Sequence, residues 1–445
     1  MDKNNVNQEK TFTRIGMHYF PDTLHYRESD IATWLPRLQS IGVSWLVLLS
    51  DVDRAIPESF LAALRKAQIT PIIHFDYPPG GNQLEAASLR TLLEVYARWG
   101  VQYLIFFNRP NARSSWQAAS WTQQDLVERF LDRYLPLAQL ALQNGMIPVF
   151  PPLEPGGSYW DTAFLRSTLE SLGRRRQEQL LKNMVLSAYA WTEGHHLNWG
   201  AGGPEAWTAS RPYITPPGSQ DQRGFRIYEW YQAVSKAVLS QPLPVILLQA
   251  GIEYDPLLFK PSYDIDQHAL MNLLIYRLMQ GEQVNLDDGS KFEPVDPQVL
   301  ACNFFLLSAN PESNLAPFAW YQGDQSLPAV QAIQTWMNRA VTSPIEEPGN
   351  DLNRKDYPIA HYLLLPTFEW GISDWHLDVI RPFIKKHQPT IGFSLDEAHL
   401  ARRITVIGNT QVFPEETLQR FRQIGIKVER ISGDGTSIAS QLAGR

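Results

Sequence analysis

The sequence predicts a (β/α)8 TIM barrel followed by a small Rossmann-like α/β domain, and four observations lead to that prediction. Short apolar runs alternate with helix-like patterns from about residue 14 to residue 340, which is typical of βαβ units in a parallel sheet. That segment holds eight such units. After a polar stretch the same alternation restarts and continues to the C-terminus. No Gly-x-Gly-x-x-Gly turn follows the first strand, which favours a barrel over a doubly wound open sheet.

The chain is therefore expected to divide into four segments. Residues 1–13 would be a disordered or extended N-terminus, 14–341 the barrel, 342–356 a linker of turn-forming residues, and 357–445 the small domain.

Each expected barrel strand is an apolar run bounded by turn residues, a pattern typical of strands buried on both faces. The strands are expected at 15–20, 45–50, 71–75, 101–107, 146–150, 185–191, 244–249 and 299–307. Helical periodicity predicts helices at 31–41, 60–68, 89–99, 124–143, 164–183, 225–239, 268–279 and 330–339. In the small domain, strands are expected at 362–365, 390–393, 404–407 and 427–431, alternating with helices at 375–387, 395–401, 415–424 and from 436 onward.

Composition excludes several classes of protein. The net charge is −7 and the pI about 5.8, so the chain lacks the basic surface of a nucleic-acid-binding protein. A single cysteine, Cys302, excludes an internal disulfide framework and a thiolate zinc site. No apolar run approaches the roughly 20 residues of a membrane span. The polar start, MDKNNVNQEK, has no signal-peptide core, so the chain is either cytoplasmic or part of a longer protein.

A polar tip, Asn108-Arg109-Pro110-Asn111, follows the fourth strand directly. The carboxyl ends of barrel strands form the rim at which TIM barrels carry their sites, so these residues are candidates for function. The tip resembles the Asn-Glu-Pro-Asn end of strand four in the clan A glycoside hydrolases. The seventh strand, PVILLQAGIEY, resembles the Thr-Glu-Ala-Gly ending that carries the nucleophile of that family.

Aligned with the family residue by residue, Arg109 stands at the acid/base position and Gln249 at the nucleophile position. A retaining glycosidase needs two carboxyl groups about 5–5.5 Å apart. An arginine keeps its proton at any useful pH, and an amide is a very poor nucleophile. The family mechanism is therefore not expected, and we predict a catalytically retired barrel that binds a glycan or serves as a scaffold.

The same resemblance implies a set of substrate-binding residues. Asn108 belongs to the strand-four motif, and Tyr189, Trp191 and Trp320 stand where the family places hydrogen-bonding and sugar-stacking aromatics. Trp199 lies in the long loop after strand six, where it could line a cleft or pack on the outer helices.

An alternative is an active carbohydrate hydrolase that uses displaced rim carboxylates. Glu154 and Glu193 are the best-placed pair, since they follow adjacent strands. Against this, a guanidinium at a barrel mouth needs an acceptor, so one rim carboxylate is expected to pair with Arg109. The other candidates would be ordinary loop charges, and the full set is Asp51, Asp76, Glu154, Glu193, Glu253 and Asp255.

His18, His74 and Asp76 follow or lie in strands one and three, which raises the possibility of a metal site. No fourth ligand stands out on strands five to eight. We therefore expect no metal and no cofactor, and place His18 and Asp76 among the substrate-binding residues.

The tail of the chain, RITVIGNTQVFPEETLQRFRQIGIKVERISGDGTSIASQLA, spans residues 403–443. It resembles the cell-wall-binding repeats of surface-layer proteins from Gram-positive bacteria. It departs from their pattern at Asn409 and in GDGTSIAS, and only one copy is present. The resemblance implies attachment to a cell-envelope polymer, a possible protein partner, and an extracellular or cell-surface location, with the cytoplasm as the alternative.

Overall fold

The structure is a computed structural model that describes most of the chain. The described residues are 13–81, 84–252, 264–285, 291–342, 359–366, 374–387, 389–423, 426–433 and 435–443. The expected N-terminal extension and linker lie almost entirely outside them. The chain divides into two compact units, one running from β1 to α11 and the other from β13 to α15.

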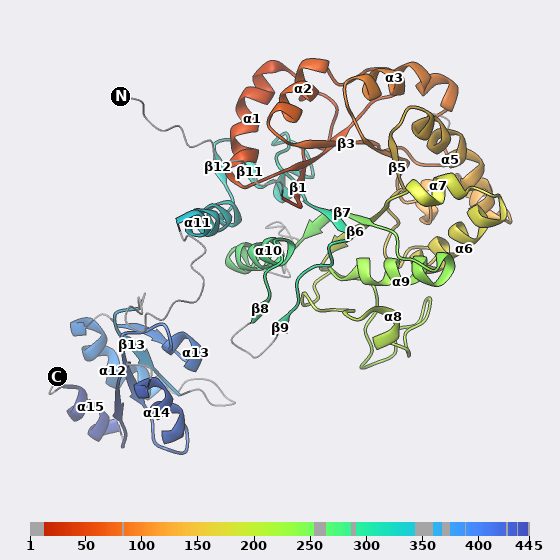
Figure 1. The fold of residues 1–445 in the computed structure, drawn as a ribbon. Helices are drawn as coiled ribbons and strands as arrows, with labels where there is room; N and C mark the ends of the chain where they lie inside the picture. Colours follow the sequence, from red (N-terminus) through yellow and green to blue (C-terminus); the bar gives the residue numbers. More distant parts are fainter. Residues whose placement is uncertain are drawn as a thin grey trace. The chain divides into compact units, whose positions relative to one another are not determined.

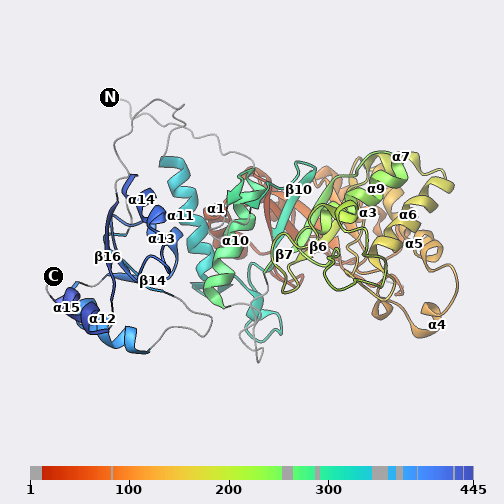
Figure 2. The same cartoon turned by 90° about the horizontal axis from the view of Figure 1, so that it is seen from below.

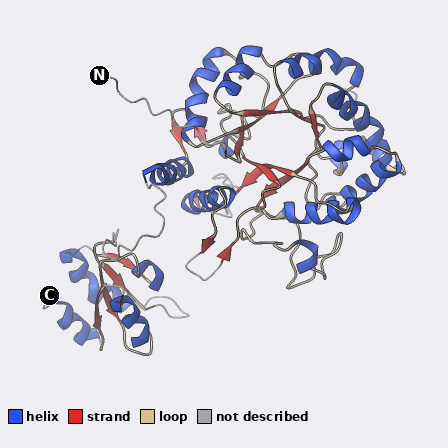
Figure 3. Cartoon of the chain, viewed as in Figure 1, coloured by secondary structure: helices blue, strands red, loops and turns tan. Residues whose placement is uncertain are grey.

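The first unit is a (β/α)8 barrel, as predicted. Eight parallel strands form one sheet in the order β5-β4-β3-β2-β1-β10-β7-β6, and Figures 1 and 3 show them as a ring inside the helices. The strands are β1 (Ile15–His18), β2 (Trp45–Leu49), β3 (Thr70–Phe75), β4 (Tyr103–Phe106), β5 (Ile147–Val149), β6 (Leu186–Trp191), β7 (Val245–Gly251) and β10 (Val299–Phe304). The last strand is shorter than expected and ends at Phe304, because Leu306 forms its backbone hydrogen bonds with Phe318 and Trp320 and not with a neighbouring barrel strand.

The ring closes between β5 and β6 through a short seam. An isolated parallel bridge joins Val149 to Val185, with hydrogen bonds of 2.7 Å from the Phe150 N–H to the Val185 carbonyl and 3.3 Å from the Val185 N–H to the Pro148 carbonyl. By comparison, β2 and β3 pair over five residues. Strand β5 has three residues, and Pro148 at its centre has no N–H to donate. The seam is thus the weakest pairing in the ring.

Inward-facing side chains fill the barrel, so its interior is a packed core and not a channel. Alternate residues of the strands meet there, as the pleat requires. The buried cluster consists of Trp45, Val47, Ile72, Ile105, Val149, Val185, Tyr189, Ile246, Leu248 and Ala301.

Amphipathic helices surround the strands, and Figure 2 shows α5, α6, α7 and α9 gathered on one flank of the barrel. The main helices are α1 (Glu28–Ser40), α2 (Glu58–Lys66), α3 (Ala86–Arg98), α5 (Leu126–Gln143), α6 (Asp161–Arg174), α7 (Glu178–Asn183), α9 (Ile227–Leu239), α10 (Ile265–Met279) and α11 (Pro328–Thr342).

One predicted helix is wrong, because 164–183 is two helices, α6 and α7. The chain breaks at Arg176, which has a φ of +55°. Just before it, Arg175 pairs with Glu128 and Asp132 of α5. The break therefore lets the end of α6 bind its neighbour.

Short elements on the loops were not expected from the sequence. They are the helical turns η1 (Arg113–Ser115), α4 (Ala118–Trp121), α8 (Gly203–Ala206) and η2 (Ala316–Phe318), and the two-residue strand pairs β8 (Val284–Asn285) with β9 (Lys291–Phe292) and β11 (Tyr321–Gln322) with β12 (Gln325–Ser326).

The second unit is a small α/β domain with a parallel sheet in the order β14-β13-β15-β16. Its elements are β13 (Tyr362–Leu364), α12 (Asp374–His387), β14 (Thr390–Gly392), α13 (Leu395–Ala398), β15 (Arg403–Ile407), α14 (Glu415–Gln423), β16 (Lys427–Ile431) and α15 (Gly435–Ala443). Tyr362 and Leu364 pack on the face covered by α13 and α14, whereas Leu363 packs on the face covered by α12 and α15. Burial on both faces gives three layers, as in Rossmann-like folds.

Candidate functional site: the carboxyl-terminal mouth of the barrel

A small pocket of about 110 Å³ lies at the carboxyl ends of the strands. Its lining residues are His18, Phe20, Pro21, Val47, Leu49, His74, Asp76, Tyr189, Gln249, Phe305, Leu306 and Leu315. Asp76 is the only carboxylate among them. This volume corresponds to about four waters at roughly 30 Å³ each, so the pocket would hold one group of a larger ligand.

Two buried histidines, His18 and His74, line the pocket. The His18 Nε2 atom accepts a 2.9 Å hydrogen bond from the Gln249 backbone N–H, so this nitrogen carries no proton. Burial, with a smaller contribution from His74, lowers the pKa of His18 to about 3. The His74 Nε2 atom lies 3.1 Å from the Phe107 carbonyl, which can only accept, so that nitrogen carries the proton. His18 is therefore neutral at physiological pH, and its remaining Nδ1 carries the proton.

Arg109 lies beside the pocket and pairs with Glu154. Its Nε atom is 2.6 Å from the Glu154 Oε2 atom, an ion pair that is not aligned as a hydrogen bond. The guanidinium carbon is also 4.8 Å from the centre of the Tyr189 ring. Gln249 lines the pocket, whereas Arg109 is not among the lining residues. The expected acceptor for Arg109 is thus Glu154.

Asn111 joins the loops that follow β4 and β5. Its side-chain amide donates to the carbonyls of Glu154 at 2.9 Å and Tyr159 at 2.8 Å, and its oxygen accepts from the Glu154 N–H at 2.8 Å. Gly157 permits this close packing, because a Cβ there would lie 2.6 Å from the Asn111 amide nitrogen. The buried amide thereby positions Glu154 opposite Arg109.

Tyr189 connects the pocket to the Asn108 side chain. Its hydroxyl donates to the Asn108 Oδ1 atom at 2.8 Å. Burial raises the pKa of Tyr189 far above its ordinary value, and the Asp76 carboxylate adds to the shift. Tyr189 is therefore a neutral phenol that stays a hydrogen-bond donor.

Glu193 follows β6 with an exposed side chain. Neighbouring groups of the mouth still partly shield the Glu193 carboxyl group from water. This desolvation raises the pKa of Glu193, and the Glu154 carboxylate raises it further. The two acids predicted as a displaced pair are thus electrostatically coupled. Glu193 holds its proton more tightly than an ordinary glutamate.

Backbone strain is concentrated at this rim. Phe107, Arg109, Glu193 and Gln249 have φ values between +42° and +72°, a region that non-glycine residues rarely adopt. Such strain persists where the surrounding structure enforces it, and it occurs often at functional sites.

The predicted aromatic residues lie in three different settings. Trp191 is half-buried, with its ring edge-on to Phe305 of the pocket at 5.8 Å between centroids. Trp199 stacks on His195 at 3.9 Å and donates its indole N–H to Asp221 at 3.1 Å, so it belongs to the long loop and not to the pocket. Trp320 corrects the prediction: it is 1% exposed and packs on Phe304 of the core, so its face is not open to a sugar.

The remaining candidates are peripheral. Asp51 accepts a 3.2 Å hydrogen bond from the Tyr77 hydroxyl, while Glu253 and Asp255 lie outside the described residues. Within the described part of the chain, no three His, Cys, Asp or Glu residues come together in an arrangement that could hold a metal ion. Likewise, no described helix is long and apolar enough to span a membrane.

Phe305, Leu306 and Leu315 line the pocket but were not predicted. Phe305 and Leu306 were expected to be part of the strand at 299–307. The strand ends at Phe304, and these two residues therefore lie beyond it, at the mouth. A cis peptide bond joins these two residues.

No protein-family model matches the sequence, and a search of curated proteins finds no match. Solved structures of similar fold include a GH128 (subgroup II) endo-β-1,3-glucanase from Sorangium cellulosum. It is 14% identical, with a TM-score of 0.38, covering 68% of this chain and 93% of that one. A GH39 β-xylosidase from Caulobacter crescentus is 13% identical (TM-score 0.44; 74% and 72% covered). Xylanase 10B from Thermotoga maritima is 10% identical (TM-score 0.43; 75% and 97% covered). These values are too low to carry over a ligand or a reaction.

Proposed function

We propose that the barrel binds a carbohydrate at its carboxyl-terminal mouth and does not cleave it with a pair of carboxyl groups. The chemistry of the mouth supports binding. Neutral His18, the Tyr189 hydroxyl, the Gln249 amide and the Asp76 carboxylate offer both donors and acceptors beside the aromatic rings of Phe305 and Trp191. Sugar hydroxyls need this combination of paired polar groups and apolar surface.

The main support for the proposal that the barrel does not cleave its ligand is the Arg109–Glu154 ion pair at 2.6 Å. Each side chain is about two-fifths exposed, so the pair adds little stability, on the order of 0–1 kcal/mol. The ion pair does, however, engage the Glu154 carboxylate. The pocket is then left with Asp76 as its one carboxylate among the described residues, and the two-carboxylate mechanism needs two.

The test of binding is calorimetric titration of the protein with short β-glucan, xylan and mannan oligosaccharides. We expect one of these to bind, and Asp76→Ala to weaken it by about ten- to a hundredfold, since a hydrogen bond to a charged group contributes about 1.5–3 kcal/mol. Lys66→Ala is the matched control, because Lys66 is exposed in the last turn of α2, which leads into the amino-terminal end of β3, the end opposite the mouth. If no oligosaccharide binds, or Asp76→Ala binds as well as the unmodified protein, the proposal is wrong.

The second candidate, hydrolysis by Glu154 and Glu193, has one observation in its favour. The pKa of Glu193 is raised by desolvation and by the nearby Glu154 carboxylate, and a carboxyl group that keeps its proton beside a second acid is typical of the general acid of a glycosidase. We expect no turnover of aryl β-glycosides by the unmodified protein. Turnover that Glu154→Gln or Glu193→Gln abolishes would replace our proposal with this one. Activity that appears only in the Arg109→Glu, Gln249→Glu double variant would support a retired enzyme.

The second unit is proposed to attach the protein to a cell-envelope polymer outside the cell. The support is the ITVIGN…VERISG pattern, which falls on β15 and β16. At the departure from the repeat pattern, the Asn409 Oδ1 atom accepts from the backbone N–H groups of Gln411 and Val412, so asparagine closes this turn with its own side chain. Co-sedimentation of the full chain with bacterial cell-wall fragments, compared with a chain ending at residue 341, tests this. Equal sedimentation of both chains, or a native protein found only in the cytosol, would contradict it.

A further inference from the structure

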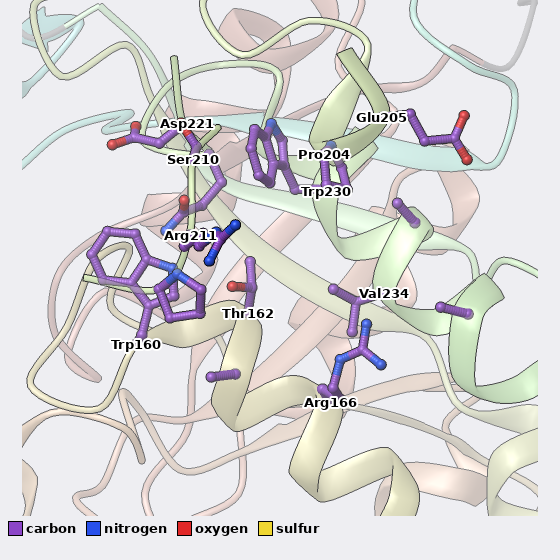
Figure 4. Close-up of a pocket in the computed structure, with 15 residues that line it drawn as sticks. Trp160, Thr162, Arg166, Pro204, Glu205, Ser210, Arg211, Asp221, Trp230 and Val234 are labelled. Carbon is purple, nitrogen blue, oxygen red and sulfur yellow. The ribbon is translucent and has the colours of Figure 1, made fainter. Parts of the chain in front are cut away.

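A second and larger cavity lies on the outer flank of the barrel, away from the mouth pocket. Its volume is about 390 Å³, within the range of roughly 300–1,000 Å³ that is usual for ligand sites. Helices α6 and α9 and the loop between β6 and α9 enclose it (Figure 4). None of its lining residues lines the mouth pocket.

One wall of this flank cavity is an apolar face of α9. Trp230, Ala233, Val234 and Ala237 all line it, with the i, i+3, i+4, i+7 spacing of residues on one side of a helix. The Trp230 indole is held by a 2.8 Å hydrogen bond from its N–H to the Gly200 carbonyl. Trp160 lines another part of the cavity. A ligand that fills this space therefore meets hydrocarbon and indole surface.

Two arginines, Arg166 of α6 and Arg211 of the loop, also line the cavity (Figure 4). Within the described chain, neither guanidinium takes part in an ion pair or a side-chain hydrogen bond, whereas Arg109 and Arg223 are paired with Glu154 and Asp221. In Figure 4 the carboxylate of Glu205 points away from both guanidinium groups. The cavity is also lined by the Asp221 carboxylate, but Arg223 pairs with that group. Arg166 and Arg211 are thus two cations at the edge of an apolar space that no protein carboxylate of the described residues neutralises.

The loop that carries Arg211 is held in place by buried groups. Asp221, whose side chain is 1% exposed, accepts from the Trp199 indole at 3.1 Å and the Thr215 hydroxyl at 2.7 Å, and pairs with Arg223. The Tyr213 hydroxyl accepts the Trp160 backbone N–H at 2.8 Å, which joins the loop to the start of α6. A preformed site loses little conformational entropy when a ligand binds.

We propose that the flank cavity binds a small organic carboxylate, with its aliphatic or aromatic body against α9 and its carboxyl group between Arg166 and Arg211. The planar guanidinium fork matches a carboxylate in geometry and keeps its charge at every useful pH. The apolar wall selects against small inorganic anions, which gain nothing from hydrocarbon contact.

Calorimetric titration of the full chain tests this with 4-phenylbutyrate and the neutral 4-phenyl-1-butanol as matched probes. We expect saturable one-to-one binding of the carboxylate and at least tenfold weaker binding of the alcohol. Arg166→Gln and Arg211→Gln should each weaken the carboxylate by about tenfold or more. Arg98→Gln, an exposed arginine at the end of α3, is the control and should change nothing.

A second variant, Ala237→Trp, tests the position of the body of the ligand. Ala237 is exposed and lines the cavity, so a bulky side chain there should block binding without disturbing the core. Equal affinity for the acid and the alcohol, unchanged affinity in both arginine variants, or no binding of the carboxylate would overturn the proposal. Binding of phenyl phosphate as tight as the carboxylate would show an oxyanion site without carboxylate selectivity and would also contradict it.

Discussion

Asp161 is a fully buried carboxyl group at the start of α6, and its environment makes the stability of the barrel depend on pH. Burial raises its pKa to about 6, even though it accepts hydrogen bonds from the Gly156 N–H, the Gln222 amide and the Tyr231 hydroxyl. The folded protein therefore binds this proton more tightly than the unfolded chain, where the pKa is 3.8. Between about pH 4 and pH 6, this group weakens folding as the pH rises.

Asp161→Asn removes that titration. Relative to the unmodified protein, the free energy of unfolding of the variant should improve by up to about 3 kcal/mol between pH 4 and pH 7, since two pKa units correspond to roughly that amount. Urea denaturation at each pH measures it. A difference between the two proteins that is constant over this range would contradict the prediction.

Asp221 is a contrasting control for Asp161, because its pKa is shifted in the opposite direction. Burial alone would raise its pKa, but hydrogen bonds from Arg223, Thr215 and Trp199 outweigh that effect and lower it to about 2. The stability that Asp221 contributes is therefore present above pH 4 and is lost as the pH falls toward 2. Asp221→Asn should lose stability relative to the unmodified protein as the pH rises from 2 to 4, with no further change above that range.

At the scale of elements, Asn111 holds two mouth loops together through three hydrogen bonds to backbone groups. Asn111→Ala would leave the Glu154 N–H and the Tyr159 carbonyl without these partners in a buried place, at a cost of about 3 kcal/mol. Thermal and urea denaturation measure the loss. Asn183→Ala is the control, because Asn183 makes one exposed hydrogen bond within α7, and it should cost under about 1 kcal/mol. Equal losses in the two variants would contradict this account of Asn111.

The elements also show what the sequence can and cannot predict. The apolar runs that became β1 to β7 were recognisable, because a strand buried on both faces needs an unbroken apolar segment. The break at Arg176 was not, since it depends on Glu128 and Asp132 in another helix. Trp320 looked like a rim residue by its position after a strand, but the chain carries it back into the core. That Arg109 needs an acceptor followed from its charge, whereas the choice of Glu154 depends on the fold of two loops.

At the scale of the whole molecule, the seam between β5 and β6 should be the first part of the barrel to open. Amides in short, poorly paired segments exchange with solvent through local opening at low free energy. The Phe150 and Val185 amides should therefore exchange faster than those of Leu247 and Leu248, which lie inside the long strand β7. Native-state hydrogen exchange resolved by NMR measures this. Slower exchange at the seam than within β7 would contradict it.

The seam also affects how the mouth can work. Glu154 follows β5 and Glu193 follows β6, so the two acids stand on opposite sides of the thinnest joint in the ring. Local opening of this seam would change the distance between these two carboxyl groups. A ligand that contacts the loops after both β5 and β6 would hold the two edges of the seam together. Ligand binding at the mouth would then stiffen the barrel along its whole height.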